Sequence, residues 1–243
     1  MGKQRTFLPY AVLGLGTLGA VFRAWFLLSR DARGLPLPNH PGDILTWAAA
    51  VVCLAVILLG LRGMQDERQH HVLFPPALLP GIATFSAAVG LAVTEIPLLL
   101  SGGDAFSWIS GFLGMLAAVA MIPLGVCRIQ GKRPAFLPLL LVNVYFLFQP
   151  VWQYRQWMWS SQLQVYAIPL IASVLLMLAA YHRSALFAGV GSRRSYVFFS
   201  LAAGLFCLLA IPGQRLAFYL TMALWMLTGT GSLALEPEQG DAP

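Results

Sequence analysis

Two ionisable side chains, Arg23 and Glu95, lie well inside apolar runs of the sequence. Each precedes the end of its run by between one and two helical turns, which would place both at a similar depth. An isolated charge there costs at least about 2.5–3.5 kcal/mol on insertion scales. We therefore expect the two to form an ion pair or gate beneath an outward-facing vestibule. In the alternative, Arg23 extends to the headgroups and Glu95 caps the loop at 101–104.

A polar ladder follows one face of a later apolar run. Tyr145, Gln149, Gln153 and Gln156 recur at helical spacing, and Pro150 removes one backbone hydrogen bond within the same run. Polar atoms surrounded by lipid need partners. The ladder predicts a cavity lined by amides and aromatic rings, which would suit a neutral polar or weakly anionic ligand. The alternative is that each amide bonds singly to a neighbouring helix.

Other reactive side chains do not form a catalytic or metal-binding motif. Glu67 and His70 have the Glu-x-x-His spacing of di-metal bundles, but the sequence holds no second copy. Ser110 lacks the preceding glycine and the intramembrane histidine that a membrane serine protease needs. The three cysteines are scattered, and P-loop, dinucleotide-binding and HExxH motifs are absent from the sequence. We expect no enzymatic activity, no metal and no cofactor.

Composition places these residues in a lipid bilayer. Hydrophobic residues make up 58% of the 243-residue chain and charged residues 10%, whereas soluble domains carry roughly a quarter charged residues. Uncharged runs long enough to cross a bilayer recur along the chain, and they are continuous instead of alternating. This pattern predicts an all-α integral membrane protein. The net charge of +6 comes from short loops between apolar runs, so we expect no nucleic-acid partner.

Eight transmembrane helices, arranged as antiparallel helical hairpins, are predicted, with seven as the fallback. With the N-terminus inside, ten Lys and Arg residues fall on the inner side and four on the outer side, and Arg23 completes the fifteen. This distribution satisfies the positive-inside rule for a plasma-membrane protein whose two termini are both cytoplasmic. The predicted helices cover 7–28, 44–62, 77–100, 105–127, 135–156, 163–181, 195–213 and 216–235.

The predicted domain organisation is a single transmembrane domain, 1–235, followed by an acidic disordered tail, 236–243. Leu-Pro pairs that open several helices predict a repeat of helical hairpins, with 1–128 and 129–235 as two halves. Proline near helix starts recurs for other reasons, which is the alternative explanation. Strips of small residues, including Gly111 with Gly114, predict close contacts between helices.

Two functions of different classes fit these patterns. The first is a small-solute transporter or membrane ligand-binding protein, with Arg23 and Glu95 beneath a rim of Gln and Trp side chains and prolines as bending points. The second is a non-catalytic subunit or scaffold, whose Trp-rich segment contacts a membrane protein partner or a second copy of the chain. A membrane enzyme acting on a lipid-linked substrate ranks third, because no nucleophile, base or metal cluster supports it.

Overall fold

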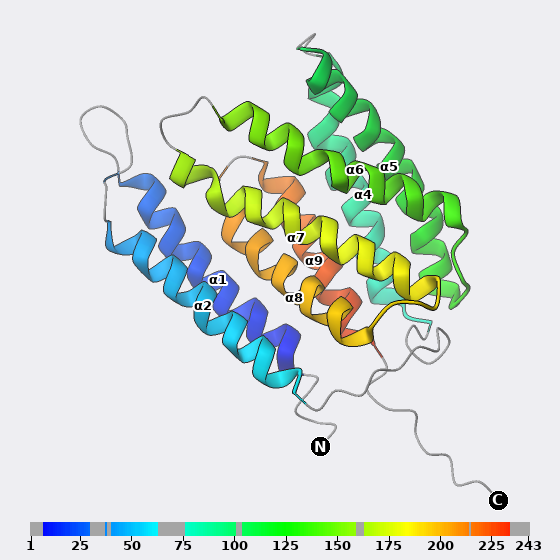
Figure 1. Cartoon of the computed structure of the whole chain (residues 1–243), viewed down its shortest axis with the longest axis horizontal. Helices are drawn as coiled ribbons and strands as arrows, with labels where there is room; N and C mark the ends of the chain where they lie inside the picture. Colours follow the sequence, from blue (N-terminus) through cyan, green and yellow to red (C-terminus); the bar gives the residue numbers. More distant parts are fainter. Residues whose placement is uncertain are drawn as a thin grey trace, which may run out of the picture.

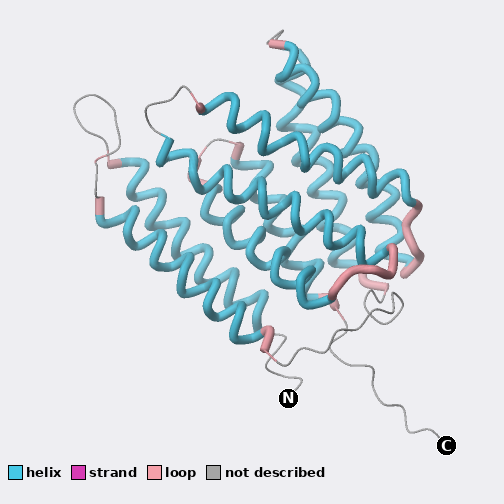
Figure 2. Tube along the Cα trace, in the orientation of Figure 1, coloured by secondary structure: helices cyan, strands magenta, loops and turns pink. Residues whose placement is uncertain are grey.

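The computed structural model describes residues 7–29, 37, 40–62, 76–100, 104–158, 163–213 and 215–233. Within these ranges the chain is helical and contains no strand, which confirms the expected all-α fold (Figures 1 and 2). The helices are α1 (Phe7–Leu28), α2 (Pro41–Gly60), α4 (Leu78–Leu100), α5 (Ala105–Gln130), α6 (Phe136–Trp157), α7 (Leu163–Phe187), α8 (Arg193–Ala210) and α9 (Leu216–Gly231).

Seven of these helices are long and apolar enough to cross a membrane, so the chain is a multi-pass membrane protein. The eighth, α9, is apolar but has 16 residues, fewer than the roughly 20 that span a typical hydrocarbon core. It lies deep in the bundle and packs against α4 and α8 (Figure 1). Because α9 is surrounded by other helices, its length does not have to match the thickness of the bilayer.

Local signals set most helix ends. His40 accepts a hydrogen bond from the backbone of Gly42 at the start of α2, and Asp104 caps α5 in the same way. Gly131 ends α5 in the left-handed conformation that glycine adopts without strain. The main departure from prediction is α7, which continues past 181 to Phe187. It does so because Arg183 is buried inside the bundle instead of marking the membrane boundary.

Six helices close into a ring. Each of α4, α5, α6, α7, α8 and α9 packs against the next, and α9 packs back against α4. The α1–α2 hairpin lies outside this ring against α8, and α1 also contacts α9 (Figure 1). Because α6 and α9 lie opposite each other in the cycle, long side chains from both fill the space between them. The buried polar residues Glu95, Gln149 and Gln153 belong to helices of this ring.

The bundle has two chemically distinct ends. The start of α1 and the end of α9 lie together, since Pro9 approaches Gly231, and Arg128 near the end of α5 donates to Ser232. We call this the inner end, after the predicted orientation. The ends of α1, α4 and α6 and the start of α9 lie at the opposite, outer end.

Candidate functional site

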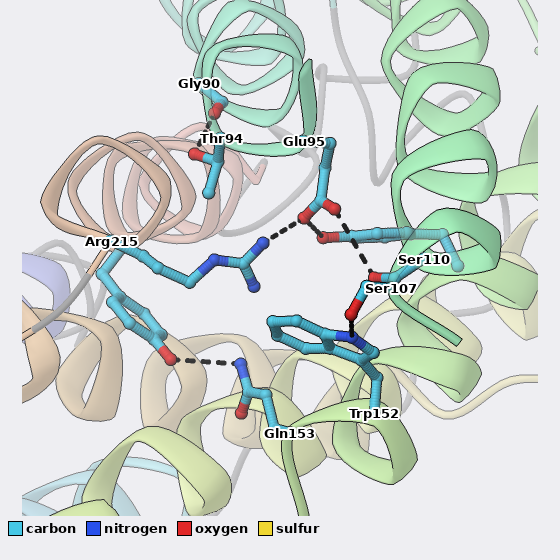
Figure 3. A network of polar contacts seen from close by, with 10 residues as sticks. Gly90, Thr94, Glu95, Ser107, Ser110, Trp152, Gln153 and Arg215 are labelled. Atoms are coloured by element: carbon cyan, nitrogen blue, oxygen red, sulfur yellow. Dashed lines mark hydrogen bonds and ion pairs between the residues drawn. The ribbon is translucent and has the colours of Figure 1, made fainter. Parts of the chain in front are cut away.

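The central feature of the outer end is an ion pair between Glu95 of α4 and Arg215, the residue that precedes α9. Glu95 is completely buried, and the side chain of Arg215 is 13% exposed. Figure 3 shows the guanidinium directed at the carboxylate, with the ring of Trp152 close by. The central carbon of the Arg215 guanidinium lies 4.9 Å from the centre of the Trp152 ring, which is a cation–π distance. The charge of Glu95 is thus matched within the bundle.

Neighbouring helices complete the shell around Glu95. The hydroxyl of Tyr145 on α6 donates to Glu95 Oε1 at 2.8 Å, and Ser110 on α5 lies at 3.5 Å from Oε2. Gly114 of α5 makes room for the carboxylate, because a Cβ atom there would lie 2.4 Å from Glu95 Cγ. The predicted glycine strip on this helix therefore serves the site as well as close packing.

The backbone at Arg215 is held in an uncommon conformation. Its φ of 65° and ψ of 43° place it in the left-handed region, which is the sole such case among the non-glycine residues described. A non-glycine residue there costs on the order of 1–2 kcal/mol. The guanidinium also sits at the positive end of the α9 dipole, which disfavours a cation. Both costs are offset by the contact with Glu95.

Two amides inside the ring carry polar atoms without protein partners. Gln149 and Gln153 are both completely buried. Gln153 donates to the hydroxyl of Tyr219 at 3.2 Å, but its Oε1 accepts no hydrogen bond, and neither amide atom of Gln149 makes one. Nη1 of Arg215 is likewise buried without a partner. Buried polar atoms of this kind cost about 1–3 kcal/mol each when nothing satisfies them, and Gln149 and Gln153 place theirs about one helical turn apart on the buried face of α6.

A rim of polar side chains lies at the mouth of the ring. The hydroxyl of Ser107 accepts from Trp152 Nε1 and from Gln156 Nε2, both at 3.3 Å, and donates to Asp104 at 2.6 Å. The hydrogen bond from the Ser107 hydroxyl lowers the pKa of Asp104 below its ordinary value. Partial desolvation opposes this shift, whereas the backbone N–H of Ser107 and the charge of Arg155 add to it. Asp104 also lies 3.3 Å from Arg155 in a solvent-exposed pair. The rim ties the start of α5 to the end of α6.

Arg23 has a different role from the one predicted. Its Nη2 donates to the backbone carbonyl of Val165 at 2.8 Å. That carbonyl would otherwise accept from the nitrogen four residues later, but residue 169 is proline and has no N–H. Arg23 is buried, so it does not extend to the headgroups. It fastens α1 to the proline-interrupted turn of α7.

The predicted pairing of Arg23 with Glu95 is therefore wrong, and so is the alternative in which Glu95 caps the adjoining loop. The depth argument placed both residues at the same end of the bundle, but depth does not identify lateral neighbours. Of the six predicted site residues, the structure brings Glu95, Tyr145, Gln149 and Gln153 into the ring interior. Gln156 lies exposed on the rim, and Arg23 lies at the α1–α7 contact.

Sequence reasoning missed Arg215 and Tyr219. Arg215 was counted among the four basic residues of the outer side, and Tyr219 was not singled out. A usable signal was present, because Arg215 and Tyr219 are four positions apart and therefore share one face of the last apolar run.

The arrangement offers unpartnered donors and acceptors to a small solute, and the described residues of the site include no nucleophile–base pair aligned for covalent chemistry. Within the described ranges, no group of three or more His, Cys, Asp or Glu side chains could hold a metal ion. The Asp66–His71 segment, which carries the Glu-x-x-His spacing, lies outside the described residues. Comparisons with known proteins found no match among family models, curated proteins or solved structures.

Proposed function

We propose that this chain binds a small polar or anionic solute inside the helix ring and carries it across the membrane. The observation that supports this most directly is the set of buried, unpartnered polar atoms on Gln149, Gln153 and Arg215. Unpartnered polar atoms inside a helix bundle cost free energy, so a bundle gains nothing from burying them unless a polar ligand satisfies them. A solute or the water that precedes it would supply the missing hydrogen bonds.

The donor and acceptor pattern suggests the chemistry of the solute. Gln149 offers an amide N–H group and a carbonyl, Gln153 offers a carbonyl, and Arg215 offers one further N–H. Glu95 already accepts from another nitrogen of Arg215, so the ion pair carries no net charge. A carboxylate, or a hydroxyl-bearing or zwitterionic small molecule, would match these groups. A purely apolar ligand would leave all of them unsatisfied.

Proline positions support a transport role. Pro97 of α4 follows Glu95 by two residues, and Pro150 of α6 is adjacent to Gln149. Each removes a helix hydrogen bond beside the site and provides a bending point. Alternating access requires such movement around a fixed binding position. In the proposed orientation, eight helices cross the plasma membrane with both termini in the cytoplasm, and the site opens toward the outside.

The subunit hypothesis relied on the Trp-rich segment as a surface for a partner. Trp152 is buried and donates to Ser107, and Trp157 stacks on Tyr166 with 4.6 Å between ring centres. Trp159 lies outside the described residues. Because two of these rings are engaged within the chain itself, the solute site is the better supported proposal. The native mass after mild extraction separates the two, since one or two chains fit a self-sufficient transporter and a much larger mass fits a subunit.

The proposal is tested by thermal unfolding of the purified protein with a panel of small monocarboxylates, amino acids, polyols and inorganic anions. The matched variant is Gln149→Leu, which keeps the side-chain volume but removes both unpartnered amide atoms. We expect at least one solute class to raise the Tm of the wild type and to have no effect on the variant. The variant alone should be as stable as the wild type or more so. Equal shifts in both proteins, or no shift with any class, would overturn the proposal.

A further inference from the structure

A groove at the inner end of the bundle lies apart from the Glu95 site. Both α1 and α4 pack against α9, and the groove lies between the start of α1 and the start of α4, over the second half of α9. Its volume is about 420 Å³, which falls within the roughly 300–1,000 Å³ of ligand-binding pockets. The groove is therefore large enough to hold a molecule.

The walls of the groove are apolar and exposed. Tyr10, Leu79 and Leu224 line it from the three helices and are 72%, 66% and 42% exposed. Pro9 and Pro80, from the Leu-Pro pairs that open α1 and α4, also line it. Proline lacks the backbone N–H that other residues in a first helical turn leave without a partner. The two first turns can therefore border an apolar occupant without presenting those donors to it.

The inner end of the groove is polar. Thr228 and Ser232 contribute hydroxyl groups there, and Nη2 of Arg128 donates to Ser232 Oγ at 2.6 Å, so a cationic side chain lies beside that end. From Leu224 to Ser232 the groove extends about 12 Å along α9, at a rise of about 1.5 Å per residue. It thus presents a polar end near the membrane surface and an apolar stretch toward the middle of the bilayer. A phospholipid carries its phosphate and its acyl chain in the same order.

We propose that this groove holds one acyl chain of a phospholipid, with the phosphate beside Ser232, where the positive charge of Arg128 favours it. The volume distinguishes this occupant from a helix of a second copy of the chain. One helical turn, about 10 Å across and about 5.4 Å long, takes up on the order of 400 Å³. A helix laid along the groove for about 12 Å would need roughly twice the space available, whereas an acyl chain is much thinner. This site is separate from the proposed solute site and is tested independently of it.

The first measurement uses the unaltered protein in nanodiscs that contain phosphatidylcholine with a photoreactive diazirine in one acyl chain. We expect the peptides that carry Tyr10, Leu79 and Leu224 to be labelled several-fold more than the α2 peptide that carries Val51 and Val52. Those two valines are 64% and 52% exposed but lie outside the groove, so they report contact with ordinary bilayer lipid. Equal labelling of all these peptides would show that the groove holds no lipid of its own and would overturn the proposal.

A matched pair of glycine variants tests whether the groove retains the lipid. Gly231 lines the groove, and a Cβ atom there would meet Pro9 at 3.7 Å, an ordinary contact, so Gly231→Leu fills the space without a clash. Gly14→Leu adds the same side chain at an exposed position of α1 outside the groove, where a Cβ meets no atom within 4 Å. Both variants should keep the Tm of the wild type.

Retention is measured by native mass spectrometry after purification from the membrane in mild detergent. We expect one phospholipid on the wild type and on Gly14→Leu, and several-fold less retention by Gly231→Leu. Equal retention by the two variants, or no phospholipid on the wild type, would overturn the proposal.

Discussion

Glu95 and Arg215, which are 120 positions apart in the sequence, form an ion pair inside a ring of six helices. The carboxylate comes from the last turns of α4, and the guanidinium comes from the residue before α9. Their contact joins two neighbouring helices of the ring, and Tyr145 of α6 donates to the same carboxylate. The pair is therefore both a structural link and the charged side of the proposed solute site.

A column of side chains connects this pair to the inner end. Tyr145, which donates to Glu95, contacts Phe146 with ring centres 5.3 Å apart, and Phe146 stacks on Trp225 at 6.1 Å. Trp225 in turn lies against Arg183. These packed rings close the interior below the site. The solute would consequently reach Gln149 from the outer end in this state of the protein.

The first prediction concerns the coupling within the ion pair. Glu95→Gln or Arg215→Gln should each lower the free energy of unfolding by about 3–5 kcal/mol, because each leaves a buried charge without its partner. The double variant should lose distinctly less than the sum of the two. Thermal or denaturant unfolding in detergent micelles measures this cycle. Strictly additive losses would show that the two charges do not stabilise each other.

The second prediction concerns Arg23 and the proline of α7. Arg23→Met removes the donor to the Val165 carbonyl and should cost about 1–3 kcal/mol. Pro169→Ala restores a backbone N–H that can bond this carbonyl, so Arg23→Met should cost less in that background. Pro123→Ala, which restores the equivalent bond in α5, is the control background and should leave the cost unchanged. An identical cost in all three backgrounds would refute the link between Arg23 and Pro169.

The third prediction concerns the close approach of α5 to Glu95. Gly114→Ala places a Cβ atom 2.4 Å from Glu95 Cγ, so it should lower the Tm and displace the carboxylate from Arg215. Gly14→Ala on α1 is the matched control, because a Cβ there meets no atom within 4 Å. It should be neutral or stabilising by up to about 1 kcal/mol, as expected for alanine in a helix. Tm measurements on both variants check the contrast, and equal effects would contradict the packing described for α5.

The fourth prediction concerns the pH dependence of the α5 cap. The bond from Ser107 lowers the folded-state pKa of Asp104 below its unfolded value of about 3.9. The stability from this lowered pKa is therefore fully present above that unfolded value and is lost as pH falls through the lower folded value. Asp104→Asn keeps the capping oxygen but cannot titrate. Unfolding measured between neutral and acidic pH should show an acid-dependent loss in the wild type that is smaller in the variant, and identical profiles would exclude Asp104 as its source.

The sequence predicted the helices and the end of the bundle where the polar residues meet, because both follow from local patterns. Continuous apolar runs marked the helices, and helical spacing placed Tyr145, Gln149 and Gln153 on one face, which the structure confirms as a buried face of α6. The expected partner of Glu95 was wrong because helix neighbours are a property of the ring. Closure of α9 against α4 brings Arg215 to Glu95, and no local signal in either segment encodes that closure.

Helix boundaries failed where a charge was taken to mark the membrane surface. The helix predicted over 163–181 ended before Arg183, yet Arg183 is buried beside Trp225, and α7 continues to Phe187. Arg23 shows the same effect, since the bundle supplies a backbone carbonyl that a single helix in lipid would not. A charged residue in an apolar run thus predicts an unusual environment, but the nature of that environment depends on the neighbouring helix.

Accessibility of residue 149 tests the central claim most directly and does not require knowledge of the solute. Gln149→Cys is placed in a variant whose natural cysteines are replaced by serine or alanine, and intact cells are treated with a membrane-impermeant maleimide. Leu201→Cys, equally buried on α8, is the control. The account predicts that the cysteine at 149 is labelled from outside and that the one at 201 is not. Failure to label position 149, with the variant correctly folded and inserted, would show that the amide lies in a closed core and contradict the proposed solute site.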